Sequence, residues 1–505
     1  MLTHDPDVAG LVLQIQQAPG WAQMWELRAA LARFKAAGKR VHAVLTVGDM
    51  RALYLASAAH QVHLHRAGGL FLTGLAITRT YLFGLMEKLG VKAEIVKYED
   101  YKSASEAWTR TGPSEPAREQ DRAILDGVFA AWRDALTTGR AVSAADLGRL
   151  LDGGPQTMHV ALAEHLVDHL VDDDAVADLV AQDLPGAQVV ERYVPSPTAW
   201  RRWGGPREIA ILPVVGSIVD GPSAGALPIP LLGGETTGDA SFIAALEAAV
   251  ADGNVIGVVV RVDSGGGSAI ASDKMHRAIA KAAEKKPVVV SFGEVAASGG
   301  YYLAVASRTI MATPLTITGS IGIFSGKADT SGLYALLGLT TATERTGERA
   351  DMMHGHRPWT ERERELAHAA LRAYYDRFLE LVAAGRKISV EEAQRLARGR
   401  VWLGTDALAH GLVDSHAGLW DAIAQVRAEA GVDADEPLHL SYRGTLGALS
   451  SLQRLVAGAV GLDSAAPALA PPADLAAQAR EVFGRLQVLG DGAPLAMSPF
   501  TLTIE

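Results

Sequence analysis

The stretch Asp252-Gly253-Asn254-Val255-Ile256-Gly257-Val258-Val259-Val260-Arg261-Val262 decides the fold, because the chain carries a second version of it. That version is Asp5-Pro6-Asp7-Val8-Ala9-Gly10-Leu11-Val12-Leu13-Gln14-Ile15, about 247 positions earlier. In both versions turn-forming residues precede a short β-branched run, which is typical of a buried strand. A nearly equal offset relates residues 161–168 to residues 407–414. The chain is therefore predicted to contain two related repeats.

The order of elements around this stretch is the same in both repeats. The predicted strands and helices are residues 8–15, 25–36 and 40–47 in the first repeat and residues 255–262, 275–284 and 287–292 in the second. Strand, helix and strand in succession imply right-handed crossovers and a largely parallel sheet. Helical periodicity follows at 113–184 and 360–431, with capping boxes at 143–146 and 389–392. The predicted fold class is α/β: two tandem repeats, each with a mostly parallel sheet core and a helical arm.

These patterns also predict the domain boundaries, which are 1–195 for the N-terminal repeat, 196–207 for a linker, 208–440 for the C-terminal repeat and 441–505 for a tail. The linker is rich in proline and glycine. Residues 222–239 are expected to form a surface loop. The tail is expected to hold two short amphipathic helices joined by a flexible connector at 464–472, without chemistry of its own. The strand at 208–213 has no counterpart after Met1, so the first repeat is expected to be truncated at its start.

Composition excludes several classes of protein. The chain has 505 residues, of which 49% are hydrophobic and 21% charged, as expected for two or three packed domains. Its net charge of −10 argues against nucleic-acid binding. It has no cysteine, which excludes disulfides, thiolate zinc sites and a cysteine nucleophile. No export signal and no apolar run long enough to span a membrane occur, so the protein is expected to be soluble as written, with an upstream anchor left open.

The two repeats differ at their reactive residues. The sequence Ala297-Ser298-Gly299-Gly300 in the second repeat aligns with Asp49-Met50-Arg51-Ala52 in the first, so only the second has a serine there. A nucleophile at a strand-to-helix turn needs small neighbours and nearby N–H groups that can bind an oxyanion. The glycine cluster at 263–268 follows another strand and makes a two-donor oxyanion hole plausible. A tight packing turn and a phosphate-binding loop are the alternative interpretations, although the glycine-lysine signature of a nucleotide site is absent.

Lys102 supplies a candidate base from the first repeat. It aligns with Asp351, so only the first repeat keeps a lysine at this position. A lysine has an ordinary pKa near 10.4 and works as a base at neutral pH only if burial lowers that pKa strongly. A serine-lysine dyad then needs no histidine. A solvated surface charge is the alternative for Lys102, and Lys327 is a second candidate base that would make the first repeat dispensable.

The histidines suggest no metal site. His63 and His65 share one face of a predicted strand, and His354 and His356 flank a glycine. Neither pair has the carboxylate and third ligand expected of a zinc site. We predict no metal and no cofactor.

Together, residues 101–104 and 297–301 resemble the signal peptide peptidase A family, also called protease IV, in its long tandem form. The resemblance covers the chain apart from its tail and implies the Clp protease and crotonase fold. It implies roles for five residues: nucleophile, general base, a serine that holds the lysine, and two oxyanion N–H groups, namely Ser298, Lys102, Ser320, Gly266 and Gly299. The family usually has Ser-Pro-Gly-Gly at the oxyanion loop, where this chain has Ser264-Gly265-Gly266-Gly267.

The resemblance also implies a setting. The family forms dome-shaped tetramers in which lysine and serine meet across domain and protomer boundaries, on the periplasmic side of the inner membrane. The implied function is a serine endopeptidase that uses a Ser/Lys dyad on apolar peptides such as cleaved signal peptides. Two alternatives remain at this point: an acyl-CoA enzyme of the crotonase type, and a catalytically silent assembly protein.

Overall fold

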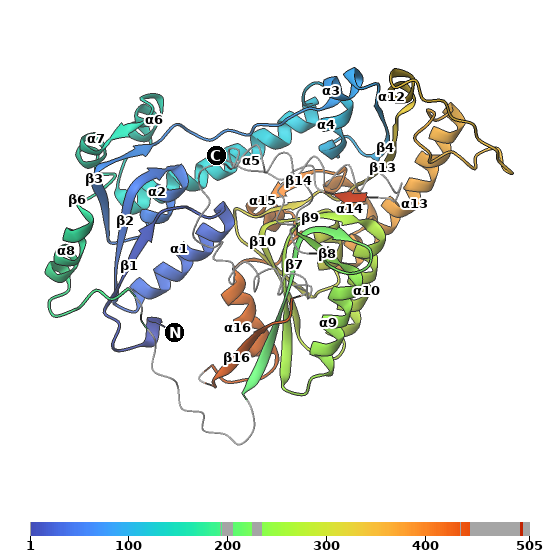
Figure 1. Cartoon of the computed structure of the whole chain (residues 1–505). Helices are drawn as coiled ribbons and strands as arrows, with labels where there is room; N and C mark the ends of the chain where they lie inside the picture. The colour runs from blue at the N-terminus through green and yellow to red at the C-terminus, as the bar shows by residue number, and fades with distance from the viewer. Residues whose placement is uncertain are drawn as a thin grey trace, which may run out of the picture.

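A computed structural model describes residues 2–191, 193, 206–224, 235–434 and 436–444, and the backbone of residues 495–497. The linker prediction at 196–207 lies almost entirely outside these residues, as do the predicted tail helices and their connector. The fold is α/β, as predicted, with one parallel sheet core in each repeat (Figure 1).

The first sheet consists mainly of three parallel strands, β1 (Gly10–Ile15), β2 (Arg40–Asp49) and β3 (Gln61–Phe71). Two short strands pair with β3, namely β5 (Gln156–Thr157), which is antiparallel, and β6 (His169–Val171), which is parallel. The helices α1 (Trp21–Ala36) and α2 (Met50–Ala56) connect the three main strands. The predicted strands are confirmed to within a few residues, and α1 begins four residues before the expected position.

The second sheet has β7 (Arg207–Val219), β9 (Val255–Ser268) and β10 (Val288–Ala297) as parallel neighbours at its centre. The helices α9 (Asp239–Ala251) and α10 (Ala269–Ala283) cover one face, and α16 (Leu419–Glu429) packs on the other (Figure 1). Alternate residues of β9 enter these two apolar clusters: Val258, Val260 and Val262 face α9 and α10, and Val259 faces α16. The continuous β-branched run in the sequence therefore reflects burial of both faces of the strand.

Apart from β4, which is described below, the remaining strands of the second sheet are shorter. They are β8 (Thr236–Gly238), β11 (Thr309–Ala312), β12 (Ile317–Gly319), β13 (Ile323–Asp329), β14 (Val401–Leu403), β15 (Ser415–His416), β16 (Leu438–Tyr442) and β17 (Leu495–Met497). The expectation of a surface loop through residue 239 is wrong at its end, because β8 pairs with β7. The carboxylate of Asp239 accepts hydrogen bonds from the N–H groups of Gly221 and Ala240 and fixes this return of the chain.

The helical arms are built on two long helices, α5 (Glu115–Arg140) and α13 (Glu361–Arg386). Ser143 and Ser389 cap α6 (Ala144–Asp152) and α14 (Val390–Leu396), where each side chain accepts a backbone N–H. The arms are not wholly helical as expected, because strands β5, β6, β14 and β15 interrupt them. The other helices of the arms and their surroundings are α3 (Phe83–Lys88), α4 (Glu106–Thr109), α7 (Met158–Ala163), α8 (Val176–Asp183), α12 (Ser331–Leu336) and α15 (Gly404–Ala409).

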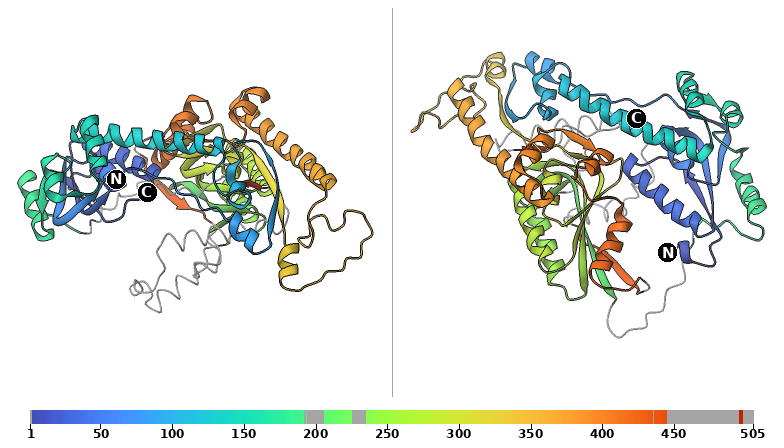
Figure 2. Two further views of the ribbon diagram at one scale, coloured as in Figure 1. Left: turned by 90° about the horizontal axis from the view of Figure 1, so that it is seen from above. Right: turned by 180° about the vertical axis from the view of Figure 1, so that it is seen from behind.

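The two repeats are interlocked. Strand β4 (Lys92–Tyr98) belongs to the first repeat in sequence but pairs antiparallel with β13 of the second sheet. Figure 2 shows α5 running from the first repeat across the second, where Ile124 and Val128 share an apolar cluster with Val401 and Leu403. Residues just after β4 are thereby carried to the second sheet, and Lys102 is among them.

Candidate active site

Ser298 lies at the turn between β10 and the short helix α11 (Gly299–Ala304). Its backbone has φ 54° and ψ −113°, which is unfavourable for a residue with a side chain. Two hydrogen bonds hold this conformation: the Ser298 N–H donates to the carbonyl of Gly319 at 2.8 Å, and the Tyr302 N–H donates to the carbonyl of Ser298 at 2.8 Å. Strained backbone of this kind is common where a side chain must be presented for chemistry.

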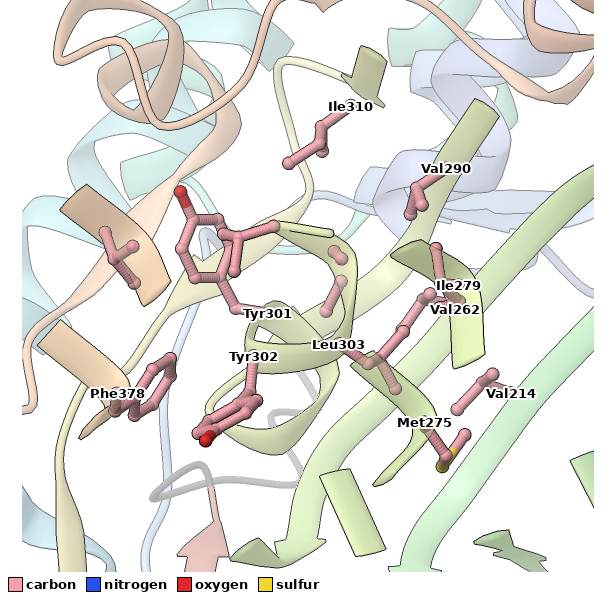
Figure 3. Packing of buried hydrophobic residues seen from close by; sticks show 14 of the residues in the cluster. Val214, Val262, Met275, Ile279, Val290, Tyr301, Tyr302, Leu303, Ile310 and Phe378 are labelled. Carbon is pink, nitrogen blue, oxygen red and sulfur yellow. The ribbon is translucent and has the colours of Figure 1, made fainter. Parts of the chain in front are cut away.

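Helix α11 is anchored by its two tyrosines, as Figure 3 shows. The Tyr301 hydroxyl donates to the carbonyl of Leu412 at 2.8 Å, and the ring of Tyr302 lies 4.6 Å from that of Phe378. The small neighbours of Ser298 have a steric reason, since a Cβ on Gly300 would come within 2.9 Å of the carbonyl oxygen of Ser264. The turn therefore packs tightly on β9, which positions Ser298 beside the glycine cluster.

Lys102 approaches Ser298 from the first repeat. Its Nζ lies 2.7 Å from Ser298 Oγ and 3.0 Å from both the carbonyl oxygen and Oγ of Ser320. All three side chains are 0% exposed. Burial lowers the pKa of Lys102 well below its ordinary value. The Lys102 amine is therefore placed to take a proton from the serine hydroxyl.

Ser320 holds the amine from the opposite side. It follows β12 and has φ 51°, and its N–H donates to the carbonyl of Arg400 at 2.6 Å. The structure thus brings together Lys102, Ser298 and Ser320, three of the residues predicted from the sequence. All three belong to the same chain, so the expectation that lysine and serine meet across a protomer boundary is not needed to form the contact.

The glycine cluster forms the C-terminal end of strand β9. Gly266 has φ 100°, a conformation that favours glycine, and its N–H donates to Ser264 Oγ at 3.1 Å. Ser264 Oγ in turn donates to the carbonyl of Gly216 at 2.6 Å. Ser264 pairs with Ala296 of β10, two residues before Ser298. The structure therefore places Gly266 on the strand beside Ser298 and Gly299, while the oxyanion roles of both glycines remain predictions.

Lys327 does not reach Ser298. Its Nζ donates to the carbonyl oxygens of Met352, His354 and Arg357 at 2.8–2.9 Å. These three bonds use all the donors of an ammonium group. Lys327 therefore fixes the 352–357 loop and is not placed to act as the base.

Sequence reasoning missed Gln120, a buried residue of α5 that bonds to the residue after Lys102. Its side-chain nitrogen donates to Ser103 Oγ at 2.7 Å, and its oxygen accepts the N–H of Val401 at 3.3 Å. It thereby ties the residue after Lys102 to β14. A lone glutamine on a helix carries no pattern that would have identified it.

Charged side chains pack around Tyr101, the residue before Lys102. Tyr101 packs beneath the guanidinium groups of Arg398 and Arg400, 5.4 and 5.0 Å from its ring centre, and its hydroxyl donates to Glu119 at 2.6 Å. These groups stack over the residue preceding Lys102. The Lys102 side chain itself is fully buried.

The histidines of β3 contact other groups of the first repeat. His63 lies 3.0 Å from His42, and His42 lies 3.0 Å from the carboxylate of Asp183, while His65 accepts the N–H of Ala67. Burial lowers the pKa of His63 to about 4. Among the described residues, no cluster of three or more histidine, aspartate or glutamate side chains is arranged to hold a metal ion. In the same part of the chain, no helix is long and apolar enough to cross a membrane.

The chain is similar to known proteins across both repeats. The model of Peptidase family S49 matches residues 33–185 and 280–433, one match in each repeat. Serine protease SPPA, chloroplastic, of Arabidopsis thaliana is 30% identical over 453 residues, which cover 86% of this chain and 65% of that protein. Protease 4 of Salmonella typhi is 31% identical over 460 residues, covering 87% of this chain and 71% of that protein.

Among solved structures, a mutant of ClpP1 from Listeria monocytogenes is similar over 42% of this chain and 94% of that chain, with 16% identity and a TM-score of 0.26. The family model and both relatives match across the two repeats that build the site. The chain therefore belongs to Peptidase family S49.

Proposed function

We propose that the protein is a serine endopeptidase with Ser298 as nucleophile and Lys102 as general base. The observation that carries this proposal is the 2.7 Å contact between the two side chains, both fully buried. Burial lowers the pKa of Lys102 well below its ordinary value and thereby favours the neutral amine, whose lone pair can accept the serine proton. An acyl-CoA enzyme that stabilises an enolate would not need this pair.

The proposed reaction begins when Ser298 Oγ attacks the substrate carbonyl while its proton moves to Lys102 Nζ. The N–H groups of Gly266 and Gly299 stabilise the resulting oxyanion, with that of Gly266 turning from Ser264 Oγ toward it. Lys102 then gives the proton to the leaving amine, and water hydrolyses the ester with the same lysine as base. Ser320 positions the amine throughout by its two contacts at 3.0 Å.

The proposed substrates are apolar peptides such as cleaved signal peptides. Support comes from a relative in Enterococcus faecium named putative signal peptide peptidase SppA, which is 35% identical over 190 residues. We further propose that the protein works as a homotetramer on the periplasmic side of the inner membrane. Light scattering on the purified protein measures the oligomer, and a monomer would contradict that part of the proposal.

The test is hydrolysis of a fluorogenic apolar peptide by purified variants. Ser298→Ala and Lys102→Ala are each expected to lower kcat/KM by at least about 10³-fold, because a catalytic dyad acts as a unit. Lys92→Ala, an exposed lysine on the strand that leads to Lys102, is the matched control and should keep wild-type activity. Retained activity in Lys102→Ala would show that another group is the base.

A further inference from the structure

The regular pairing of β9 with β10 is interrupted just before Ser298. Val262 pairs with Phe292 and Ser264 pairs with Ala296, so one residue of β9 stands opposite three residues of β10. The residues between these pairs are Asp263 on β9 and, on β10, Gly293, Glu294 and Val295. An interruption of this kind disrupts the ladder of main-chain hydrogen bonds and bends the strand. The two strands, which lie side by side in Figure 1, therefore need other contacts at this point.

Side chains satisfy the backbone groups of the interrupted segment. The carboxylate of Asp263 accepts the N–H of Val295 at 3.2 Å, and the N–H of Glu294 is a second donor to it. On the other side, the hydroxyl of Thr316 donates to the carbonyl of Gly293 at 2.9 Å. Asp263 thus supplies an acceptor for two N–H groups of the segment that leads to the nucleophile.

Asp263 lies between the two halves of the proposed catalytic machinery. It precedes Ser264, whose Oγ accepts the N–H of Gly266. Its carboxylate holds Val295, which lies three residues before Ser298. An oxyanion hole requires donors about 3 Å from the oxygen that becomes charged, so the spacing of these two strands matters for the reaction. One side chain therefore joins the strand of the proposed oxyanion glycine to the strand of the proposed nucleophile.

The glycine opposite Asp263 has a steric reason that involves the same carboxylate. A Cβ on Gly293 would lie 2.9 Å from a carboxylate oxygen of Asp263, 3.0 Å from its Cγ and 3.2 Å from its Cβ. These are the three nearest atoms, and Gly293 does not have a positive φ. The absence of a side chain at residue 293 therefore leaves room for the Asp263 carboxylate.

The first repeat has neither this acid nor the serine. Gln16 aligns with Asp263 at the offset of 247 residues. The pairing of β1 with β2 extends only to Ile15 and Leu45, one residue before this position. Met50 stands at the serine position of the same repeat. The carboxylate and the nucleophile therefore occur together in the second repeat.

We propose that Asp263 is a positioning residue that sets Ser298 against the N–H of Gly266 by holding the interrupted segment of β10. This inference rests on the proposed function. Asp263 acts through the backbone of Val295 and takes no part in proton transfer. Its loss should lower kcat and leave KM nearly unchanged, because the alignment it provides is needed in the transition state.

The test compares kcat and KM of Asp263→Ala, Asp263→Asn and the wild type on the fluorogenic peptide. Asp263→Ala should lower kcat at least about tenfold and change KM less than about twofold. Asp263→Asn keeps a side-chain oxygen for the Val295 N–H, so its kcat should stay within about threefold of the wild type. An unchanged kcat in Asp263→Ala, or equal losses in both variants, would overturn the proposal.

Asp239→Ala is the matched control for a loss of stability alone. Asp239 is also buried, and its carboxylate also accepts two backbone N–H groups, those of Gly221 and Ala240. It follows β8, which pairs with β7 and not with β10. Asp239→Ala should lower the midpoint of thermal unfolding while kcat of the folded protein stays at the wild-type value. A loss of kcat equal to that of Asp263→Ala would contradict a specific role of Asp263.

A double variant tests the contact between the two strands directly. Gly293→Ala places a Cβ against the carboxylate of Asp263 and should lower kcat at least about fivefold. In the Asp263→Ala background two of the three nearest atoms are gone, so the same substitution should lower kcat further by less than about twofold. If the two losses multiply in full, Gly293 and Asp263 act independently and the proposal is wrong.

The activity of the wild type separates the two possible failures. If the wild type hydrolyses the peptide and Asp263→Ala does so equally well, the positioning role is wrong and the proposed peptidase function stands. If the wild type does not hydrolyse the peptide, the proposed function fails, and the positioning role that rests on it fails with it.

Discussion

The partners of the Lys102 amine are oxygen atoms of two neutral serines. Burying a charged amine among them would therefore lower the stability of the folded chain. A charged lysine in such surroundings loses its hydration without gaining an opposite charge. Burial therefore lowers the pKa of Lys102 and favours its neutral form in the folded chain. The chemistry proposed for Lys102 and its unfavourable effect on stability have the same physical cause.

We predict that Lys102→Met raises the free energy of unfolding at pH 7. Because burial lowers the pKa of Lys102, the unfolded chain binds more protons than the folded chain between the folded pKa and the ordinary value of 10.5. The free energy of unfolding of the wild type therefore rises with pH up to about 10.5 through this group. The difference in free energy of unfolding between Lys102→Met and the wild type shrinks over the same pH range. Urea unfolding of both proteins at a series of pH values between 7 and 10 measures this.

The control for that series is Lys92→Met, because Lys92 is exposed in the folded state. Its stability relative to the wild type should not change with pH. A Lys102→Met advantage that is constant across the series would show that the folded chain keeps this lysine protonated.

At the scale of single residues, the sequence allowed the dyad to be predicted because each repeat lacks one partner. Met50 stands where the second repeat has Ser298, and Asp351 stands where the first has Lys102. The comparison of the repeats therefore indicates that one site takes its serine from the second repeat and its lysine from the first, which a single repeat would not reveal. Gln120 escaped prediction because its importance comes only from what it contacts in the folded chain.

At the scale of elements, α1 is held at its first turn by a side chain of the other repeat. The N–H groups of Ala22 and Gln23 donate to the carboxylate of Glu294 on β10, at 3.1 and 2.8 Å. This carboxylate does the work of an N-cap side chain, because the N-cap residue Gly20 has none. A helix of the first repeat is thus fixed on a strand that leads to Ser298.

We predict that Gly20→Ala destabilises the protein by about 1–3 kcal/mol, because the new Cβ would overlap the Glu294 carboxylate and leave two helix N–H groups without an acceptor. The control is Gly148→Ala in α6, where a Cβ meets no atom within 4 Å. Removing a glycine from a helix interior should stabilise by about 0.5–1 kcal/mol. Thermal unfolding compares both with the wild type, and equal midpoints for the two variants would contradict the clash.

Short strands mark the limit of prediction at this scale. The apolar runs of β1 and β9 were predictable because burial imposes a pattern over several consecutive residues. Strands β5, β8, β14 and β17 have only two or three residues each, and their pairing depends on partners far away in the chain. No local sequence signal distinguishes such a strand from a loop.

At the scale of the whole molecule, both repeats keep one structural ion pair. Arg140 of α5 binds Asp168 at 2.7 Å, and Arg386 of α13 binds Asp414 at 2.6 Å, at equivalent positions. Each arginine is nearly buried and ties the end of its long helix to a turn 25 residues later in the chain. The repeats therefore share their supporting contacts and differ in their reactive residues.

The exchange of β4 into the second sheet could not be predicted, because strand order follows from three-dimensional packing.

We predict that an equimolar mixture of Ser298→Ala and Lys102→Ala, refolded together, stays inactive on the fluorogenic peptide. Each chain joins its own lysine to its own serine, so neither variant can complete the site of the other. Recovery toward a quarter or more of wild-type activity would show that chains exchange their β4 segments. Refolded wild type carried through the same procedure is the control for recovery of native protein.

The crossing of β4 has a further consequence for how the active site responds to dilution. When two halves of a site sit on one polypeptide, their encounter is governed by an effective concentration, on the order of millimolar for short flexible connections, and not by the amount of protein present. Pairing of β4 with β13 along seven residues restricts the two halves further. The lysine and serine stay at fixed stoichiometry and in register even at very low protein concentration, where a site assembled from separate chains would come apart.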